Sequence, residues 1–102
     1  MDNAVYQLAC LFARQVSERY APLAVYLYGS QANGTATERS DIDIAVIMPP
    51  MGVQERMKLL AELISMAAKI DGSIEPYVVI DSGEFDKFSF YAEVVETGIK
   101  LL

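Results

Sequence analysis

Residues 41–48 read Asp41-Ile42-Asp43-Ile44-Ala45-Val46-Ile47-Met48 and are followed by two prolines. The β-branched, apolar run from residue 42 predicts a buried strand over residues 42–48 that ends at the prolines. Alternate residues of a strand share a face, so the side chains of Asp41 and Asp43 project side by side. At about 4 Å and an effective dielectric of ~20, two carboxylates repel each other by roughly 4 kcal/mol. Either one carboxylate takes up a proton, or a cation such as Mg²⁺ lies between them and keeps both ionised.

A second apolar run, residues 23–28, leads directly into Gly29-Ser30. This pattern predicts a strand that ends in a tight turn. Glycine allows backbone torsions that a side chain forbids, and it lets a ligand approach the main chain closely. If a short helix covers residues 31–33, its free N–H groups and its dipole face any anion bound at the turn. We therefore expect a phosphate site at Gly29-Ser30.

Together these segments resemble the minimal nucleotidyltransferases of the DNA polymerase β superfamily. The resemblance is carried by the Gly29-Ser30 turn, a spacing of ten residues, the Asp41-x-Asp43 pair and Gly34-Thr35-Ala36 in the intervening loop. Weaker similarity extends over nearly the whole chain. The resemblance implies an α/β (α+β) fold of the polymerase β-like type, in which helices flank a small mixed β-sheet.

The resemblance also implies a site. In that family the Gly-Ser turn holds a triphosphate, and the aspartates bind two divalent metals together with a third carboxylate from a later strand. The best candidate for the third acid is Glu75, in the apolar run 74–80. We therefore expect two Mg²⁺ ions, with Mn²⁺ as an alternative, and ATP as substrate. The residues assigned in this way are Asp41, Asp43 and Glu75 for metal binding and catalysis, and Gly29, Ser30 and Gly34 for nucleotide binding.

The sequence departs from the family pattern beside the turn. Many relatives have a basic residue after the Gly-Ser pair and another two residues further on, where this chain has Gln31 and Asn33. Weaker phosphate binding is the expected consequence. Arg39 is the only basic residue between residues 33 and 40, and it is a candidate contact to phosphate. The alternative for Arg39 is an exposed ion pair with Glu38.

Composition limits the function further. A length of 102 residues predicts one domain over residues 1–102, and 8 basic against 14 acidic residues give a net charge of −6. Because there is no basic cluster, nucleic acid is not an expected partner. The absence of histidine and the presence of one cysteine exclude a Ser-His triad, a zinc finger and a disulfide framework.

Location and partners follow from the same counts. Cys10 is expected to be a free thiol, and no apolar run approaches the ~20 residues of a membrane helix, so we expect a soluble, cytoplasmic protein. The apolar share of 53% is high for a small chain. We therefore expect apolar surface that is reserved for a partner, in an oligomer or a heterocomplex.

Three longer helices are predicted. The helix over residues 3–20 has one apolar stripe that is expected to face the core, with a partner-binding face as the alternative. The helix over residues 52–70 is apolar on two faces, which predicts burial on more than one side. The helix over residues 84–97 is expected to bury Phe85, Phe88, Ala92 and Val95 and to turn Phe90, Tyr91 and Val94 to other sides. Residues 99–102 form either an edge strand or a docking tail.

The predicted topology brings the candidate acids together. Ser30 and Asp41 can serve one ligand only if strands 23–28 and 42–48 are antiparallel. The helix 52–70 between two strands of one sheet makes strands 42–48 and 74–80 parallel, with a right-handed crossover, so that Glu75 lies near the aspartates. The alternative is an edge-strand glutamate in water, which Pro76 favours in part, and Asp71 or Asp81 would then have to be considered as the third acid. No glycine-rich dinucleotide fingerprint is present.

The preferred function is transfer of AMP from ATP to a hydroxyl group. The chain has no room for an acceptor-binding domain, so the acceptor is expected on another protein. The resemblance implies a HEPN-domain ribonuclease toxin, modified on a tyrosine, with this chain as its antitoxin. The alternative is a non-catalytic antitoxin that neutralises its partner by contact. A third alternative is an acidic pair that binds stray divalent metal.

Overall fold

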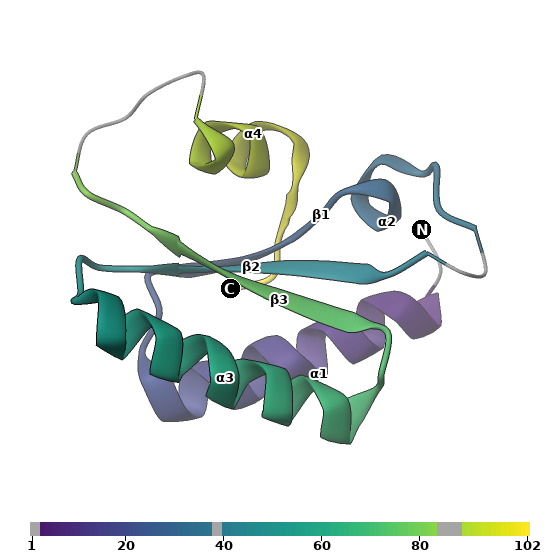
Figure 1. The fold of residues 1–102 in the computed structure, drawn as a ribbon. Coiled ribbons are helices and arrows are strands. Elements are labelled where there is room, and N and C mark those ends of the chain that lie inside the picture. The colour runs from purple at the N-terminus through teal and green to yellow at the C-terminus, as the bar shows by residue number, and fades with distance from the viewer. Residues whose placement is uncertain (1–2, 38–39, 84–88) are drawn as a thin grey trace.

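The computed structural model describes residues 3–37, 40–83 and 89–102, and Figure 1 shows the arrangement of their helices and strands. In chain order the elements are α1 (Asn3–Tyr20), β1 (Ala24–Tyr28), α2 (Ser30–Asn33), β2 (Ile42–Met48), α3 (Val53–Ile70), β3 (Ile74–Ile80), α4 (Phe90–Thr97) and β4 (Ile99–Lys100). The strands predicted over residues 42–48 and 74–80 have these bounds in the structure.

The strands form one mixed sheet in the order β3-β2-β1-β4. β1 is antiparallel to both β2 and β4, and β2 is parallel to β3. The predicted antiparallel and parallel pairings are therefore confirmed. The edge position predicted from Pro76 is also confirmed, because β3 ends the sheet on one side. Residues 99–100 form the edge strand at the other side, which resolves the alternatives for the end of the chain.

The main core lies between one face of the sheet and the helices α1 and α3, which Figure 1 shows together on that face. Phe12, Leu27, Ile44 and Leu63 are among the largest side chains that are fully buried there. Because alternate strand residues share a face, Ile42, Ile44 and Val46 all enter this core. The apolar stripe of α1 faces the core as predicted, since Ala9, Phe12, Ala13 and Val16 are buried.

A smaller core lies on the opposite face of the sheet, under α4. Ala45, Ile47, Val79 and Val94 are buried in it. β2 therefore buries side chains on both of its faces, which explains why its sequence is apolar almost without a break. Asp43 precedes Ala45 on this face and is only half-buried, so the sheet becomes accessible where β2 begins.

The prediction that α3 is buried on more than one side was wrong. Leu59, Leu63, Met66 and Ala67 are buried, but Met57 is 67% exposed and Ile64 is 52% exposed. The core side of α3 packs on the sheet and on α1. Among the described residues, no element covers the other side.

The prediction for the last helix was wrong in part. The structure describes α4 from Phe90, after Ser89, whose side chain accepts a hydrogen bond from the Ala92 N–H; Phe85 and Phe88 lie outside the described residues. Ala92 is buried as predicted, but Val94 is buried as well. The chain turns at Gly98, where a Cβ would lie 2.5 Å from the Val94 carbonyl oxygen and 3.0 Å from that of Leu27. This close return brings the last turn of α4 against β1.

None of the helices in the described ranges combines the length and the apolar character needed to cross a bilayer.

Candidate metal and nucleotide site

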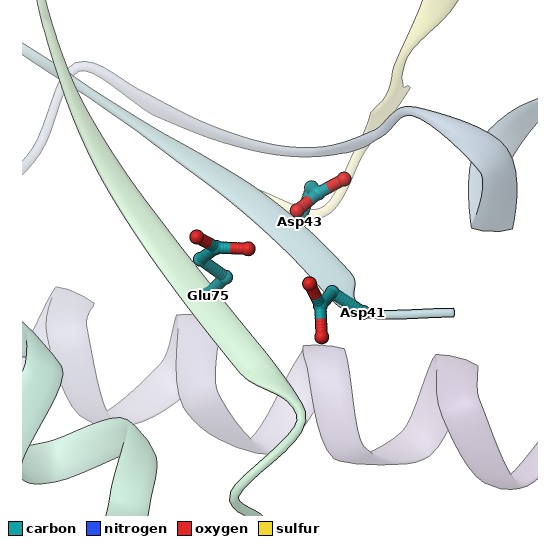
Figure 2. A group of neighbouring side chains, drawn as sticks. All are labelled: Asp41, Asp43 and Glu75. Carbon is teal, nitrogen blue, oxygen red and sulfur yellow. The ribbon is translucent and has the colours of Figure 1, made fainter. Parts of the chain in front are cut away.

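Three carboxylates converge at the start of the parallel strand pair. Asp41 lies just before β2, Asp43 lies on β2, and Glu75 lies directly opposite Asp43 on β3. Each offers one oxygen atom, and these atoms all lie within 4.8 Å of one another. Figure 2 shows the carboxyl groups of Asp41, Asp43 and Glu75 gathered above the first residues of the two strands. The structure thus brings Glu75 to the aspartates, as the parallel crossover predicted.

The other two candidates for the third acid have different partners. The Asp71 carboxylate accepts hydrogen bonds from the Ser73 N–H at 2.9 Å and from the Ser73 hydroxyl at 2.5 Å, and these bonds lower the pKa of Asp71. The Asp81 carboxylate accepts from the Gly83 N–H at 2.9 Å and from the Tyr91 hydroxyl at 3.3 Å. Both aspartates therefore stabilise turns at the two ends of β3.

The surroundings of Asp43 disfavour its charged form. Burial raises the pKa of Asp43, and the negative charges of Glu75 and then of Asp41 raise it further. Asp41 and Glu75 are exposed, so solvent and ions reach the group. A divalent cation would relieve this repulsion, and carboxylate oxygens are the ligands that Mg²⁺ and Mn²⁺ prefer. The residues present therefore fit the divalent metal that the family resemblance implies.

Gly29 lies against Asp43 in a conformation that other residues rarely adopt. Its φ is 74° and its ψ is −151°. A Cβ at this position would lie 2.7 Å from Oδ2 of Asp43, which is closer than real Cβ contacts. The absence of a side chain therefore lets the turn after β1 approach the start of β2. This contact brings the Gly29-Ser30 turn beside the three carboxylates.

Ser30 begins α2, a single helical turn. The Gly29 carbonyl oxygen accepts from the N–H groups of Ala32 and Asn33, each at 3.1 Å. Gly34 ends α2 in the left-handed conformation, with φ at 81°, and its N–H donates to the Ser30 carbonyl oxygen. Gly34, predicted to bind nucleotide, therefore lies at the end of the turn opposite Gly29.

Gln31 and Asn33 both support the loop that follows the Gly29-Ser30 turn. Gln31 is only 8% exposed, and its Nε2 donates to the Ser40 carbonyl oxygen at 3.4 Å, which links α2 to the residue before Asp41. Oδ1 of Asn33 accepts from the N–H and the hydroxyl of Thr35 at 3.1 and 2.6 Å. Arg39, the predicted phosphate contact, lies outside the described residues, as does Glu38.

Two tyrosines lie beside the carboxylates and a phenylalanine packs against both of them; the sequence analysis did not identify these three residues as part of the site. The ring centroids of Tyr28 and Tyr77 are 5.6 Å apart, those of Tyr28 and Phe90 are 5.3 Å apart, and those of Tyr77 and Phe90 are 6.3 Å apart. Tyr28 lies directly opposite Asp43, and Tyr77 follows Glu75 by two residues on the same face. That alternation was a signal available in the sequence. We call these three residues the aromatic cluster.

A groove lies on the outer side of β3, next to α3. Its volume is about 330 Å³, and it is lined by Arg56, Leu60, Ile64, Glu75, Pro76, Tyr77 and Val78. Nη2 of Arg56 donates to the Val78 carbonyl oxygen at 3.1 Å, so this arginine occupies one acceptor on the open edge of the sheet. We call it the α3–β3 groove. Glu75 belongs both to the groove and to the carboxylate group.

Comparisons with solved structures show that the fold is shared with known proteins. One similar structure is that of a candidate nucleotidyltransferase from Sulfolobus solfataricus, with a TM-score of 0.63 and 24% identity over 95% of this chain and 78% of that chain. Another is a mutant of the toxin-antitoxin pair MntA–HepT, with a TM-score of 0.56 and 22% identity over 95% of this chain and 72% of that chain. At these identities the likeness shows a shared fold.

No protein of curated function matches the chain significantly. The profile of the family described as "Nucleotidyltransferase domain" matches residues 9–100, which include both aspartates, Glu75 and the Gly29-Ser30 turn. The chain therefore belongs to the nucleotidyltransferase domain family.

Proposed function

We propose that this protein transfers AMP from ATP to a hydroxyl group of a partner protein, in a reaction that depends on divalent metal. One observation carries the proposal: three carboxylate oxygens lie within 4.8 Å of one another, beside a Gly-Ser turn that opens a helix. Family membership supports a transferase of nucleotides in general. The substrate and the acceptor are proposed on the grounds given below.

Each part of the site has a role in this reaction. Asp41, Asp43 and Glu75 would hold the metal, which supplies positive charge to the phosphates as negative charge shifts onto the leaving group. The Gly29-Ser30 turn would bind the triphosphate through its N–H groups and the Ser30 hydroxyl. Gly29 matters twice, because it permits the turn and leaves room for the carboxylate of Asp43.

The chemistry is a displacement at the α-phosphorus. The acceptor oxygen forms a bond to that phosphorus, the bond to the bridging oxygen of the β-phosphate breaks, and pyrophosphate leaves. The proton of the acceptor hydroxyl must go to a base, and the sequence contains no histidine. Glu75 is exposed and lines the α3–β3 groove, so its carboxylate can receive that proton if the acceptor arrives through the groove.

The surface of α3 supports a protein as acceptor. Met57 and Ile64 are exposed on the helix that forms one wall of the α3–β3 groove, and Leu60 lies between them in the groove. Such an apolar surface favours contact with a protein rather than with a small polar acceptor. The net charge of −6 disfavours polynucleotide. The fold shared with a chain of the toxin-antitoxin pair MntA–HepT supports a toxin as the partner. That this toxin is of the HEPN type, with a tyrosine as acceptor, is the part of the proposal that rests on the family resemblance.

The rival proposal is a non-catalytic antitoxin that neutralises its partner by contact. One observation favours it. Residues 29–37 contain no lysine or arginine, and Gln31 is turned inward toward Ser40. The turn would then hold a triphosphate through N–H groups, the Ser30 hydroxyl and metal, with no cationic side chain from residues 29–37, which lowers the expected affinity for ATP.

Intact mass of the partner distinguishes the two proposals. The partner protein is incubated with Mg²⁺, ATP and this protein, either wild type or Asp43→Asn. Glu18→Gln is a matched control, because it removes an exposed carboxylate on α1, on the far side of the sheet. We expect the partner to gain one or more AMP units with wild type and with Glu18→Gln, and none with Asp43→Asn. If all three proteins neutralise the partner without a change in its mass, the rival proposal is correct.

A further inference from the structure

We propose that the aromatic cluster, Tyr28, Tyr77 and Phe90, is the platform on which the base of the bound nucleotide stacks, and that it gives the site a preference for purines. This inference rests on the proposed function, because it requires a nucleotide at the carboxylates. It adds the part of the site that would recognise the base.

The positions of the three rings support a role in binding the base. Tyr28 immediately precedes Gly29 and lies directly opposite Asp43, so it joins the triphosphate turn to the metal site. Tyr77 lies on the same face of the sheet, two residues after Glu75. Phe90, the first residue of α4, reaches both tyrosine rings, at 5.3 and 6.3 Å between centroids. A nucleotide with its triphosphate on Gly29-Ser30 and its α-phosphate at Asp43 would have its base within reach of this cluster.

Exposure indicates which ring the base would contact. Tyr28 and Tyr77 are half-buried, whereas Phe90 is 44% exposed although it is wholly apolar. The two tyrosines pack edge-on and tilted against Phe90 and hold its ring in place, at interplanar angles of 78° and 60°. An exposed aromatic ring that its neighbours hold rigidly can stack with a flat ligand at little cost in side-chain entropy.

The same geometry favours the base of the nucleotide over the ring of an acceptor tyrosine. The α3–β3 groove, through which we propose that the acceptor arrives, is lined by Tyr77 but not by Tyr28 or Phe90. The cluster extends from β3 across to β1, toward the triphosphate turn. Stacking alone discriminates by the size of the ring system, since every base has a π-face. We therefore expect ATP and GTP to bind more tightly than CTP and UTP.

A single tryptophan makes the contact measurable. The chain contains no tryptophan, so Phe90→Trp would introduce the only indole and keep an aromatic ring at that position. We expect titration with ATP and Mg²⁺ to quench its fluorescence, and titration with inorganic tripolyphosphate and Mg²⁺ to leave it nearly unchanged. ATP that binds by calorimetry without quenching this fluorophore would overturn the proposal.

Calorimetry on variants with a shortened side chain at position 90 measures how much the ring contributes to ATP binding. We expect Phe90→Ala to weaken the binding of ATP by about 5- to 150-fold and to leave the affinity for tripolyphosphate unchanged. Phe90→Leu keeps apolar packing against the tyrosines and should show the same selective loss, which separates stacking from a folding defect. Tyr6→Ala is the matched control, because Tyr6 is a similarly exposed aromatic residue on α1 and should not change ATP binding.

The outcomes separate this inference from the proposed function. If tripolyphosphate and ATP both bind, and Phe90→Ala and Phe90→Leu bind ATP as wild type does, the platform is wrong but the transferase proposal stands. If these variants bind ATP normally and raise only the KM for the acceptor protein, the cluster belongs to the acceptor site and the platform is again wrong. If neither tripolyphosphate nor ATP binds wild type, both proposals fail.

Discussion

Gly29 is held in a backbone conformation that is almost restricted to glycine, with φ at 74° and ψ at −151°. A methyl group there would be strained by the backbone and would also lie 2.7 Å from Oδ2 of Asp43. We expect Gly29→Ala to destabilise the fold by about 2 kcal/mol, which lowers Tm by roughly 10 °C in a domain of this size. Thermal unfolding followed by circular dichroism measures this.

Gly34→Ala is the matched control for that substitution. Gly34 also has a positive φ, but nothing lies within 4 Å of the Cβ that alanine would add. Only the backbone cost remains, at about 1 kcal/mol. If both variants lose the same stability, the contact between Gly29 and Asp43 does not restrict the turn.

Several of the proposed site residues were predictable because their positions depend on local rules. Alternation along β2 sets Asp41 and Asp43 side by side, and the turn after an apolar strand identifies Gly29. The structural role of Gln31 could not be predicted from such rules. Its residue type predicted only a weaker phosphate contact, whereas its inward direction depends on where the Ser40 carbonyl oxygen lies. The sequence carries no local signal for that hydrogen bond.

At the scale of elements, the pairing of strands was more predictable than the burial of helix faces. A long helix such as α3, which crosses over one face of the sheet, returns the chain so that β2 and β3 are parallel, and this pairing sets Glu75 opposite Asp43. Periodicity shows which faces of a helix are apolar, but it does not show which neighbours exist to cover them. α3 has two apolar faces and a core on one side only, so the same reasoning failed for its outer face.

Two adjacent residues of α3 should therefore differ strongly in how much stability is lost when each is replaced by alanine. Leu63 is fully buried and Ile64 is 52% exposed. Leu63→Ala removes core packing and should cost about 2–5 kcal/mol of unfolding free energy, whereas Ile64→Ala should change stability by less than about 0.5 kcal/mol. Urea unfolding of the two variants tests this. A loss of 2 kcal/mol or more in Ile64→Ala would mean that the outer face of α3 is covered in solution.

The aromatic cluster shows the limit of sequence analysis at the scale of the whole molecule. Its rings come from β1, β3 and α4, and the sequence predicted α4 to start earlier than the described helix does. Only the assembled sheet, with α4 returned to β1 at Gly98, brings Phe90 to Tyr28. Fold class and strand pairing could be predicted from short segments. A contact among three distant elements could not.

The stability of the whole molecule should depend on pH when no metal is bound. The folded state raises the pKa of Asp43 above its ordinary value of 3.8, through burial and the charges of Glu75 and Asp41. The folded protein therefore binds a proton on the Asp43 carboxyl group more tightly than the unfolded chain does, and above pH 3.8 the unfolded chain has mostly lost that proton. As pH rises through the folded pKa, the metal-free protein loses stability at this site. Asp43→Asn has no carboxyl group there and should not show that loss.

Mg²⁺ should reverse the order of stability of wild type and Asp43→Asn. At pH 7 in EDTA, we expect Asp43→Asn to be at least as stable as wild type, because the substitution removes one of three repelling charges. Mg²⁺ at ten times its Kd should add about 1.4 kcal/mol to wild type, or roughly 5–10 °C in Tm, and much less to the variant. The gain should disappear as the pH falls below the folded pKa of Asp43, since protons then compete with the metal. Thermal scans of both proteins with and without Mg²⁺ at several pH values test this, and equal responses to Mg²⁺ would show that Asp43 does not bind the metal.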